Sequence, residues 1–280
     1  MDTYCVFGHP IEHSKSPWIH ARFAELTGQT LHYEKTFVPL DSFVAVLQAF
    51  QATGGKGCNI TLPFKTEAAH IATTCSPRVA LAQACNTLKF DATGTYGDNT
   101  DGLGLVADLV GNAGFDLKNK SVLLIGAGGA AAGVLGPLLS EKPHSIWVAN
   151  RTVDKAAQLV QRHAQIAQTE GVDCKAFGLN HEALLSQSFD LVINASSSSL
   201  QGGDIPVPHT VLSSHGMACD LMYGPAAQWF IQWASAHGAV ARDGLGMLVE
   251  QAAESFQLWR GVRPPTQQVL TELRALLNRA

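Results

Sequence analysis

The feature that most constrains the fold is residues 121–133, SVLLIGAGGAAAG, a short apolar run followed by a glycine-rich turn and a stretch of small residues. Gly126, Gly128 and Ala131 have the G-x-G-x-x-(G/A) spacing of a dinucleotide-binding turn. There the first glycine permits the tight bend, the second lets the backbone approach a pyrophosphate, and the third small residue allows close helix–strand packing. Amide groups at the start of the helix attract the anion. The stretch predicts a Rossmann-type domain, with a purely structural glycine turn as the alternative.

The end of the next expected strand, 145–149, indicates which dinucleotide binds. It is followed by Asn150, Arg151 and Thr152, with Lys155 one turn further on. An NAD site usually carries an acidic residue at this place, to bond the ribose hydroxyls. Arg151 instead offers charge-assisted hydrogen bonds to a 2′-phosphate. The sequence therefore favours NADP over NAD, and the alternative is an ordinary surface arginine at the start of a helix.

Composition narrows the class of protein. A chain of 280 residues with 46% hydrophobic and 15% charged residues is long enough for two globular domains. A net charge of −4 gives no electrostatic footprint for nucleic acid. The six cysteines form no C-x-x-C pair, which argues against a disulfide scaffold or zinc site and suits a reducing cytoplasm. We therefore expect no metal and no nucleic-acid partner.

Targeting and membrane signals are also weak. The first residues, MDTYCVFGHP, lack the basic start and apolar run of a signal peptide. The stretch 122–140 carries no charge and has the length of a membrane span. Its glycine cluster and Pro137 fit a strand, a turn and a buried helix better. We expect a cytoplasmic protein with no membrane partner.

Strand and helix patterns alternate along the chain. In the first part they predict strands at 4–8, 31–37 and 58–62 and helices at 17–27 and from Asp41 or Ser42 to Phe50. In the second part they predict strands at 121–125, 145–149, 190–194 and 218–222 and helices at 103–110, 154–168 and 226–236. Two long helices, 248–259 and 267–277, close the chain. This alternation predicts an α/β fold with mostly parallel sheets.

Two polar stretches outside the nucleotide region suggest acid–base chemistry. One is CNITLPFK, which ends at Lys65, and the other is GDNTDG, which contains Asp101. A bound NADP implies hydride transfer to a ketone, which needs a proton donor nearby. If the fold brings the two loops together, the Asp101 carboxylate would orient the Lys65 ammonium as an acid–base pair. The alternatives are a solvated loop lysine and an ordinary Asx-rich turn.

A series of motifs in a fixed order resembles the shikimate dehydrogenase family, NADP-linked enzymes that reduce 3-dehydroshikimate to shikimate in aromatic amino-acid biosynthesis. The motifs are HSKSP (13–17), NITLPFK (59–65), ACNT (84–87), DNTDG (98–102), GAGGAA (126–131), NRT (150–152), YGP (223–225) and GMLVEQA (246–252). The resemblance implies two α/β domains, a substrate-binding one of residues 1–102 plus 242–280 and a Rossmann-type one of residues 103–241. It also implies that the final helices pack back on the first domain.

The resemblance further assigns roles to individual positions. Lys65 and Asp101 match the catalytic pair. Ser14, Ser16, Thr61 and Tyr223 match positions around the substrate carboxylate, and Asn86 and Gln251 match those that contact ring hydroxyls. For Ser14 and Ser16 a helix-cap role is the alternative, and for Gln251 an ordinary helical glutamine. The positions that match the cofactor site are Gly126, Ala127, Gly128, Gly129, Ala130, Asn150, Arg151, Thr152, Lys155, Leu221 and Gly244.

Three departures from the family pattern stand out, one of which is ASSSS (195–199), a variant of a usually less serine-rich loop. Ala132 replaces a basic residue common after the glycine loop, so Arg151 and Lys155 carry more of the phosphate binding. Pro77 replaces a frequent acidic residue before ACNT. The sequence leaves two rival functions open: a quinate/shikimate dehydrogenase of broader substrate or cofactor use, and a catalytically silent NADP-binding sensor. It also leaves the oligomeric state open, a homodimer included.

Overall fold

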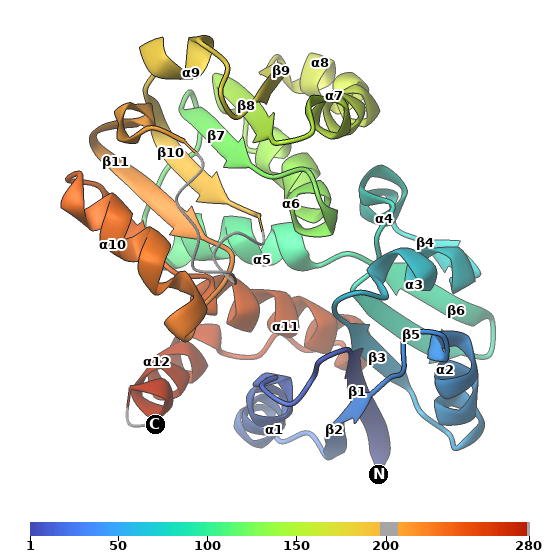
Figure 1. Ribbon diagram of the computed structural model, residues 1–280. Helices are drawn as coiled ribbons and strands as arrows, with labels where there is room; N and C mark the ends of the chain where they lie inside the picture. Colours follow the sequence, from blue (N-terminus) through green and yellow to red (C-terminus); the bar gives the residue numbers. More distant parts are fainter. Residues whose placement is uncertain (197–206, 279–280) are drawn as a thin grey trace. The chain divides into compact units, whose positions relative to one another are not determined.

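A computed structural model describes residues 1–196 and 207–278. The chain divides into two compact units, one of Met1–Gly104 with Leu248–Ala280 and the other of Leu105–Met247 (Figure 1). Each unit is built on its own six-stranded sheet flanked by helices, which confirms the predicted α/β class.

The sheet of the N-terminal unit is mixed. Its strands lie in the order β2-β1-β3-β5-β6-β4. Their bounds are β1 Asp2–Gly8, β2 Leu31–Phe37, β3 Gly57–Ile60, β4 Thr74–Cys75, β5 Thr87–Asp91 and β6 Gly94–Asp98. The pairs β1/β2, β1/β3 and β4/β6 are parallel, whereas β3/β5 and β5/β6 are antiparallel. The predicted strands of this unit are present, but the β5–β6 hairpin was not predicted.

Alternation along β1 supplies both faces of this sheet with core residues. Cys5 and Phe7 join a cluster with side chains of α2 (Phe43–Ala52), α3 (Lys65–Ile71) and α4 (Pro77–Ala82). Tyr4 and Val6 face the other way, where Tyr4 stacks on Trp259 with ring centroids 4.7 Å apart. Helices α1 (Ser16–Thr27) and α11 (Leu245–Arg260) bring the aromatic side chains of that face.

The C-terminal helices pack on the N-terminal unit, as predicted. Trp259 of α11 donates a hydrogen bond to the backbone oxygen of Leu88, at 3.0 Å. Arg22 of α1 makes a two-point ion pair with Glu272 of α12 (Thr266–Leu277), at 2.7 and 2.9 Å. This bidentate pairing lowers the pKa of Glu272 to about 2.

The second unit has the doubly wound arrangement expected from the glycine motif. Its sheet is parallel, in the order β12-β11-β10-β7-β8-β9. The strands are β7 Ser121–Ile125, β8 Ser145–Asn150, β9 Asp173–Gly178, β10 Phe189–Asn194, β11 Leu212–Asp220 and β12 Val240–Arg242. Val122, Leu123, Leu124 and Ile125 of β7 are all buried, as a central parallel strand covered on both faces requires.

The helices of this unit refine the predictions. The first, α5 Asp101–Ala107, begins in the N-terminal unit and continues in this one as a π-helical segment Asp108–Asn112. The others are α6 Gly129–Ser140, α7 Val153–Arg162, α8 Ala164–Glu170, α9 Ala183–Ser186 and α10 Gln228–Ala236. The single helix predicted over 154–168 is two helices that meet at His163, whose buried ring lies 2.9 Å from the backbone oxygen of Leu159. Short 3-10 turns occupy His209–Val211 and Gly224–Ala227.

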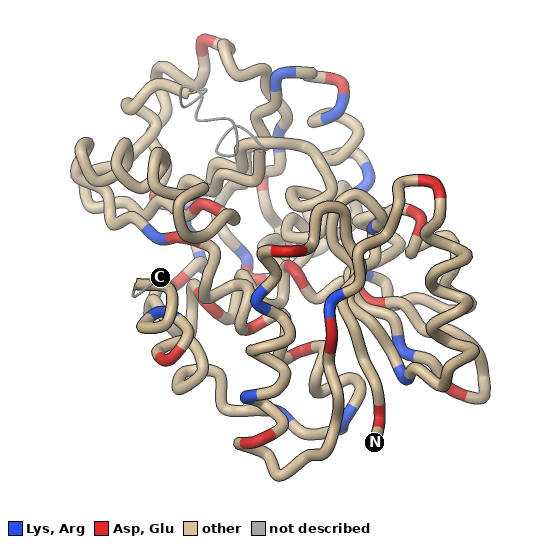
Figure 2. Tube along the Cα trace, turned by 60° about the horizontal axis from the view of Figure 1, so that its bottom comes forward, with Lys and Arg blue, Asp and Glu red and all other residues tan. Residues whose placement is uncertain are grey.

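Charged residues of both signs are interspersed along the chain (Figure 2). Within the part of the chain that is described, no helix has the length and apolar character needed to cross a membrane.

Candidate active site

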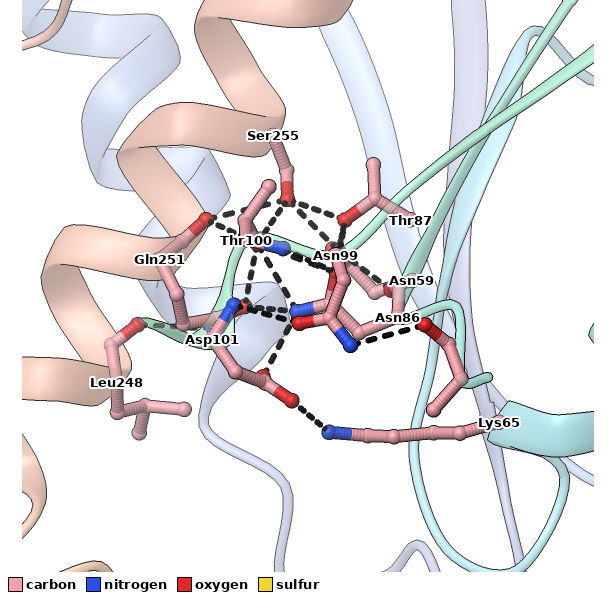
Figure 3. A network of polar contacts seen from close by, with 11 residues as sticks. Asn59, Lys65, Asn86, Thr87, Asn99, Thr100, Asp101, Leu248, Gln251 and Ser255 are labelled. Carbon is pink, nitrogen blue, oxygen red and sulfur yellow. Dashed lines mark hydrogen bonds and ion pairs between the residues drawn. The ribbon is translucent and has the colours of Figure 1, made fainter. Parts of the chain in front are cut away.

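Lys65 and Asp101 meet in the N-terminal unit. Each is the first residue of a helix, α3 and α5, and the Lys65 Nζ lies 2.5 Å from Asp101 Oδ2 (Figure 3). Their side chains are only 18% and 8% exposed, so little water screens the pair. The start of α5 favours a negative charge at Asp101, because the helix dipole is positive there. The arrangement is a largely buried ion pair in which the Lys65 side chain keeps some access to solvent.

The backbone explains why these two loops come together. The segment before β5 lies between them: Cys85 N–H donates to the Lys65 backbone oxygen at 2.8 Å, and Asn86 N–H donates to that of Asp98 at 3.0 Å. The antiparallel pairing of β5 with both β3 and β6 therefore places the end of β3 and the end of β6 on either side of Asn86.

Asn86 is the centre of the site. Its side chain is buried, and Nδ2 donates to Asp101 Oδ1 at 2.8 Å, on the carboxylate oxygen that Lys65 does not occupy. Gln251 of α11 places its Oε1 3.2 Å from the same nitrogen, while its own Nε2 donates to the backbone oxygen of Leu248. The structure thus brings together four of the predicted site residues: Lys65, Asn86, Asp101 and Gln251 (Figure 3).

The loop that carries Asp101 is fixed by a second buried acid. Asp98 accepts hydrogen bonds from Ser76 Oγ at 2.5 Å and from Arg78 Nε and Nη2 at 3.1 and 2.7 Å. Pro77 stands between these two donors as the first residue of α4, where a missing N–H costs nothing. The departure at Pro77 is therefore compatible with a rigid anchor for the Asp101 loop.

Three of the four hydroxyl residues expected at the substrate carboxylate lie in this unit, two at the start of α1 and one after β3. Ser16 begins α1 and is buried, and its backbone N–H donates to Ser14 Oγ at 3.3 Å. Thr61 follows β3, held by a backbone bond from its N–H to the Phe7 oxygen at 2.9 Å. The helix-cap alternative stays open for Ser14, because its Oγ accepts from the first amide of α1, although Lys15, the residue directly before the helix, makes no side-chain cap bond.

The remaining predicted residues lie in the second unit. Tyr223 follows β11, and burial raises its pKa. Gly244 approaches Leu221 so closely that a Cβ would lie 2.3 Å from the Leu221 backbone oxygen, and Gly244 N–H donates to the Met222 oxygen at 2.8 Å. Only glycine fits this crossing, which brings the two expected backbone positions of the cofactor site side by side.

The glycine turn of this unit fits a dinucleotide. Gly126 has φ +110°, a conformation that favours glycine, and a Cβ there would lie 3.0 Å from the Ala195 backbone. A Cβ on Gly128 or Gly129 would meet nothing within 4 Å, so open space adjoins the turn. Helix α6 starts at Gly129 with no side-chain cap, which leaves its first amides to other acceptors. These features suit a pyrophosphate at the start of α6.

The end of β8 fits a 2′-phosphate. Arg151, Thr152 and Lys155 are exposed, and Asn150 Nδ2 donates to the Thr152 oxygen at 2.8 Å, which holds the turn. Beside them lies a cavity of about 710 Å³, lined by Arg151, Val153, Ala176, Phe177, Gly178, Leu179, Asn180 and His181. Its lining contains one full positive charge and no acid, so an anionic group is favoured there.

Several polar residues that complete the network of the N-terminal unit were not predicted from the sequence. Asn59, Thr87, Thr100 and Ser255 all contact Asn86 or each other (Figure 3). A signal was present, because a polar side chain inside an apolar strand requires a buried partner. Among the described residues, no cluster of three or more His, Cys, Asp or Glu side chains could hold a metal ion.

Comparison with known proteins gives matches along the chain. Residues 6–88 match the family model described as "Shikimate dehydrogenase substrate binding domain", residues 108–201 match "Shikimate / quinate 5-dehydrogenase", and residues 244–274 match "Shikimate 5'-dehydrogenase C-terminal domain". A protein of Paracidovorax citrulli (strain AAC00-1) named shikimate dehydrogenase (NADP(+)) is 61% identical over 277 residues, 99% of this chain and 98% of that protein.

Solved structures agree with these matches. An Ael1 enzyme from Pseudomonas putida has a TM-score of 0.90 and 43% identity, with 98% of each chain covered. The shikimate 5-dehydrogenase of Thermus thermophilus, solved in complex with NADP(H) and shikimate, has a TM-score of 0.84 and 30% identity, over 98% of this chain and 99% of that one.

Proposed function

The chain belongs to the shikimate dehydrogenase family, and from this premise we propose how its residues carry out the reversible, NADP-dependent reduction of 3-dehydroshikimate to shikimate. The resemblance found in the ordered motifs is confirmed, and with it the class of enzyme and its cofactor. The chain is an oxidoreductase that acts on a small molecule. Neither the quinate-using dehydrogenase nor the silent sensor gains support over this function.

We assign the two catalytic roles to Lys65 and Asp101. When bound, NADPH supplies the hydride that reduces the carbonyl carbon. The Lys65 ammonium donates a proton to the oxygen, which becomes the new hydroxyl, and the neutral amine regains a proton from water. Its 18% exposure permits that recharging. Asp101, 2.5 Å away, holds the ammonium in place for the transfer.

The other unit-one residues bind and orient the substrate. We infer that Asn86 and Gln251 hydrogen-bond the ring hydroxyls, because both carboxamides border the Lys65–Asp101 pair. Ser14, Ser16 and Thr61 offer three hydroxyls for the substrate carboxylate, and Tyr223 of the second unit offers a fourth. Residues 1–102 with 242–280 are thus the proposed substrate-binding domain.

Residues 103–241 are the proposed NADP domain. The amides of Gly126, Ala127, Gly128, Gly129 and Ala130 would hold the pyrophosphate at the start of α6. At the end of β8, the side chains of Asn150, Arg151, Thr152 and Lys155 would hold the ribose and its 2′-phosphate. Leu221 and Gly244 would contribute backbone groups. Ala132 supplies no charge, so Arg151 and Lys155 carry the phosphate binding.

The observation that carries the proposed mechanism is the shielded contact between Lys65 and Asp101. The decisive experiment follows NADPH formation by absorbance with shikimate and with quinate, each with NADP and with NAD. High activity confined to shikimate and NADP supports the proposal. Comparable rates with quinate or NAD would move the protein to the broader dehydrogenase, and NADP binding without turnover would revive the sensor.

Assembly and compartment are part of the same proposal. We propose a cytoplasmic enzyme, since all six cysteines are free thiols and four of them are buried. A homodimer is the assembly to test first. Light scattering coupled to size-exclusion chromatography would then report twice the 29.8 kDa of one chain, and a mass of one chain would refute it.

A further inference from the structure

A chain of buried polar side chains lies beneath Asn86. Tyr33 of β2, Asn59 of β3 and Thr87 of β5 are at most 8% exposed, although each sits in the core of the N-terminal unit. Burying such groups is costly unless they are hydrogen-bonded. All three are bonded: the Tyr33 hydroxyl donates to Asn59. From Asn59 the bonds continue through Thr87 to Asn86, next to the catalytic pair (Figure 3).

Backbone groups fix the direction of this chain, because their donor and acceptor roles cannot change. Asn86 Oδ1 faces the Thr100 backbone N–H at 2.9 Å and must be the acceptor, so Nδ2 points to Asp101. Asn59 Nδ2 lies 3.2 Å from the Asn86 backbone oxygen and must be the donor, so Asn59 Oδ1 accepts from the Tyr33 hydroxyl at 2.8 Å.

The hydroxyl of Thr87 links the two amides. It accepts from Asn59 Nδ2 at 3.0 Å and lies 2.9 Å from Asn86 Oδ1, to which it donates its single proton. Ser255 Oγ, at 2.8 Å, is a competing acceptor. The Ser255 hydroxyl donates to the Gln251 backbone oxygen at 3.1 Å. With Thr87 donating to Asn86 Oδ1, each of the two hydroxyls then has an acceptor for its proton.

We propose that Thr87, oriented by Asn59, is a positioning residue for the dehydrogenase reaction: its hydroxyl holds the Asn86 carboxamide with Nδ2 toward Asp101. A carboxamide turned by half a rotation would direct an oxygen at the Asp101 carboxylate and a nitrogen at the Thr100 N–H. Two such mismatches would loosen the acid that holds Lys65. This inference rests on the proposed roles of Lys65, Asn86 and Asp101.

The test replaces the hydroxyl without changing the shape of the side chain. Thr87→Val should lower kcat/KM for shikimate by about tenfold, the order expected when one buried hydrogen bond is lost. NADP affinity should not change, because the cofactor residues lie in the other unit. Thr87→Ser, which keeps the hydroxyl, should restore activity to about the wild-type value. Thr95→Val is the matched control, since Thr95 is also buried in this sheet but its hydroxyl accepts from Gln51.

A double-mutant cycle shows whether Thr87 acts through Asn86. If it does, Thr87→Val adds little to the loss already caused by Asn86→Ala, whereas independent effects would multiply. Full activity of Thr87→Val, multiplicative losses, or equal losses in Thr87→Val and Thr95→Val would overturn the proposal.

A measurement that needs no turnover separates this inference from the proposed function. The side-chain amide protons of Asn86 are identified in NMR spectra by their loss in Asn86→Ala. Their exchange with solvent should speed up in Thr87→Val and stay slow in Thr87→Ser and Thr95→Val. Unchanged exchange in Thr87→Val would refute the positioning role even in an active enzyme. If the wild type is inactive toward shikimate but Thr87→Val still exchanges faster, the Thr87–Asn86 contact is supported and the proposed reaction is not.

Discussion

Lys65 Nζ and Asp101 Oδ2 lie 2.5 Å apart although 36 positions separate the two residues in the chain. The contact exists because both residues begin helices at the ends of β3 and β6, with the Asn86 segment bonded to the backbone on each side. An ammonium placed at a strand end thus has a partner acid that is itself held by Asn86 Nδ2. This fixed contact gives the strongest reason to assign the proton transfer to Lys65.

Removal of the Lys65 ammonium should abolish most of the turnover. We expect Lys65→Ala to reduce kcat by about two orders of magnitude or more, the range lost with a general acid, while KM for shikimate changes little. Steady-state kinetics measure both values. Lys56→Ala, an exposed lysine just before β3, is the control and should behave as wild type. A near-normal kcat in Lys65→Ala would remove Lys65 from the mechanism.

Arg151 should decide the preference for NADP. Its guanidinium can bond a 2′-phosphate at two points, so Arg151→Ala should weaken NADP binding by about ten- to a hundredfold and leave NAD binding unchanged. Calorimetric titration of both dinucleotides gives the two affinities without turnover. Arg162→Ala tests for a general loss of charge, because Arg162 is exposed at the other end of α7. An equal loss for NAD and NADP would contradict a phosphate-specific role.

Patterns in the sequence predicted those elements whose apolar residues are regular. Strands such as Ser121–Ile125 and Leu31–Phe37 were predicted at their observed bounds, since each is a compact or alternating run between turn residues. β9, Asp173–Gly178, was missed because a strand at the edge of the sheet needs no apolar run, and its residues are exposed or half-buried. The β5–β6 hairpin was missed because its glycines and Thr95 resemble a loop.

Some residues of the site could likewise be predicted from the sequence, and others could not. The glycine turn and the resemblance led to Lys65, Asn86, Asp101 and Gln251, which the structure brings together. The glycine turn and the resemblance could not predict the hydrogen bond between Asn59 and Thr87, because it joins residues of different strands. Such links depend on the pairing of β3 with β5, which no local pattern specifies.

Two glycines of the cofactor turn should respond differently to one added methyl group. Gly126→Ala should destabilise the fold by about 1–3 kcal/mol, because φ is +110° and the new Cβ would press on the Ala195 backbone. Gly128→Ala should leave stability nearly unchanged, since φ is −88° and nothing lies within 4 Å of the new Cβ.

NADP affinity should fall in Gly128→Ala, the variant whose stability is nearly unchanged. In Gly128→Ala the methyl group occupies the space that the pyrophosphate needs, so NADP affinity should fall although the protein stays stable. Thermal unfolding and calorimetric titration of both variants supply the comparison. A stable Gly128→Ala with normal NADP affinity would mean that the turn is only structural.

The buried ring of His20 should make the fold sensitive to acid. It stacks on Tyr33 with ring centroids 4.2 Å apart and an interplanar angle of 7°, and it meets Phe23 edge-on. Among the described residues, neither ring nitrogen has a well-aligned hydrogen-bond partner. Burial lowers its pKa to about 3, an effect only partly offset by the nearby Asn59 side chain. The charged form is therefore excluded from the folded state at ordinary pH.

The sign of the pH dependence follows from which state binds the proton. Between a pH near 6.5 and a pH near 3 the unfolded chain protonates His20 and the folded chain does not, so stability falls as the pH drops through this window. The loss is about 1.4 kcal/mol per pH unit, hence about 2 kcal/mol between pH 7 and pH 5. His20→Phe keeps the ring packing but binds no proton. Between pH 7 and pH 5 its free energy of unfolding should therefore fall by about 2 kcal/mol less than that of the wild type.

Urea unfolding of both proteins at the two pH values measures this difference, and carboxylates that titrate equally in both cancel from it. His32→Phe on β2 is the control for replacing a histidine by phenylalanine, because the His32 ring is exposed and lies outside the buried stack. Parallel pH dependence in wild type and His20→Phe would show that the folded state accommodates the imidazolium, by a local opening that exposes the ring. The stack of His20 on Tyr33 would then be a mobile part of the core rather than a rigid one.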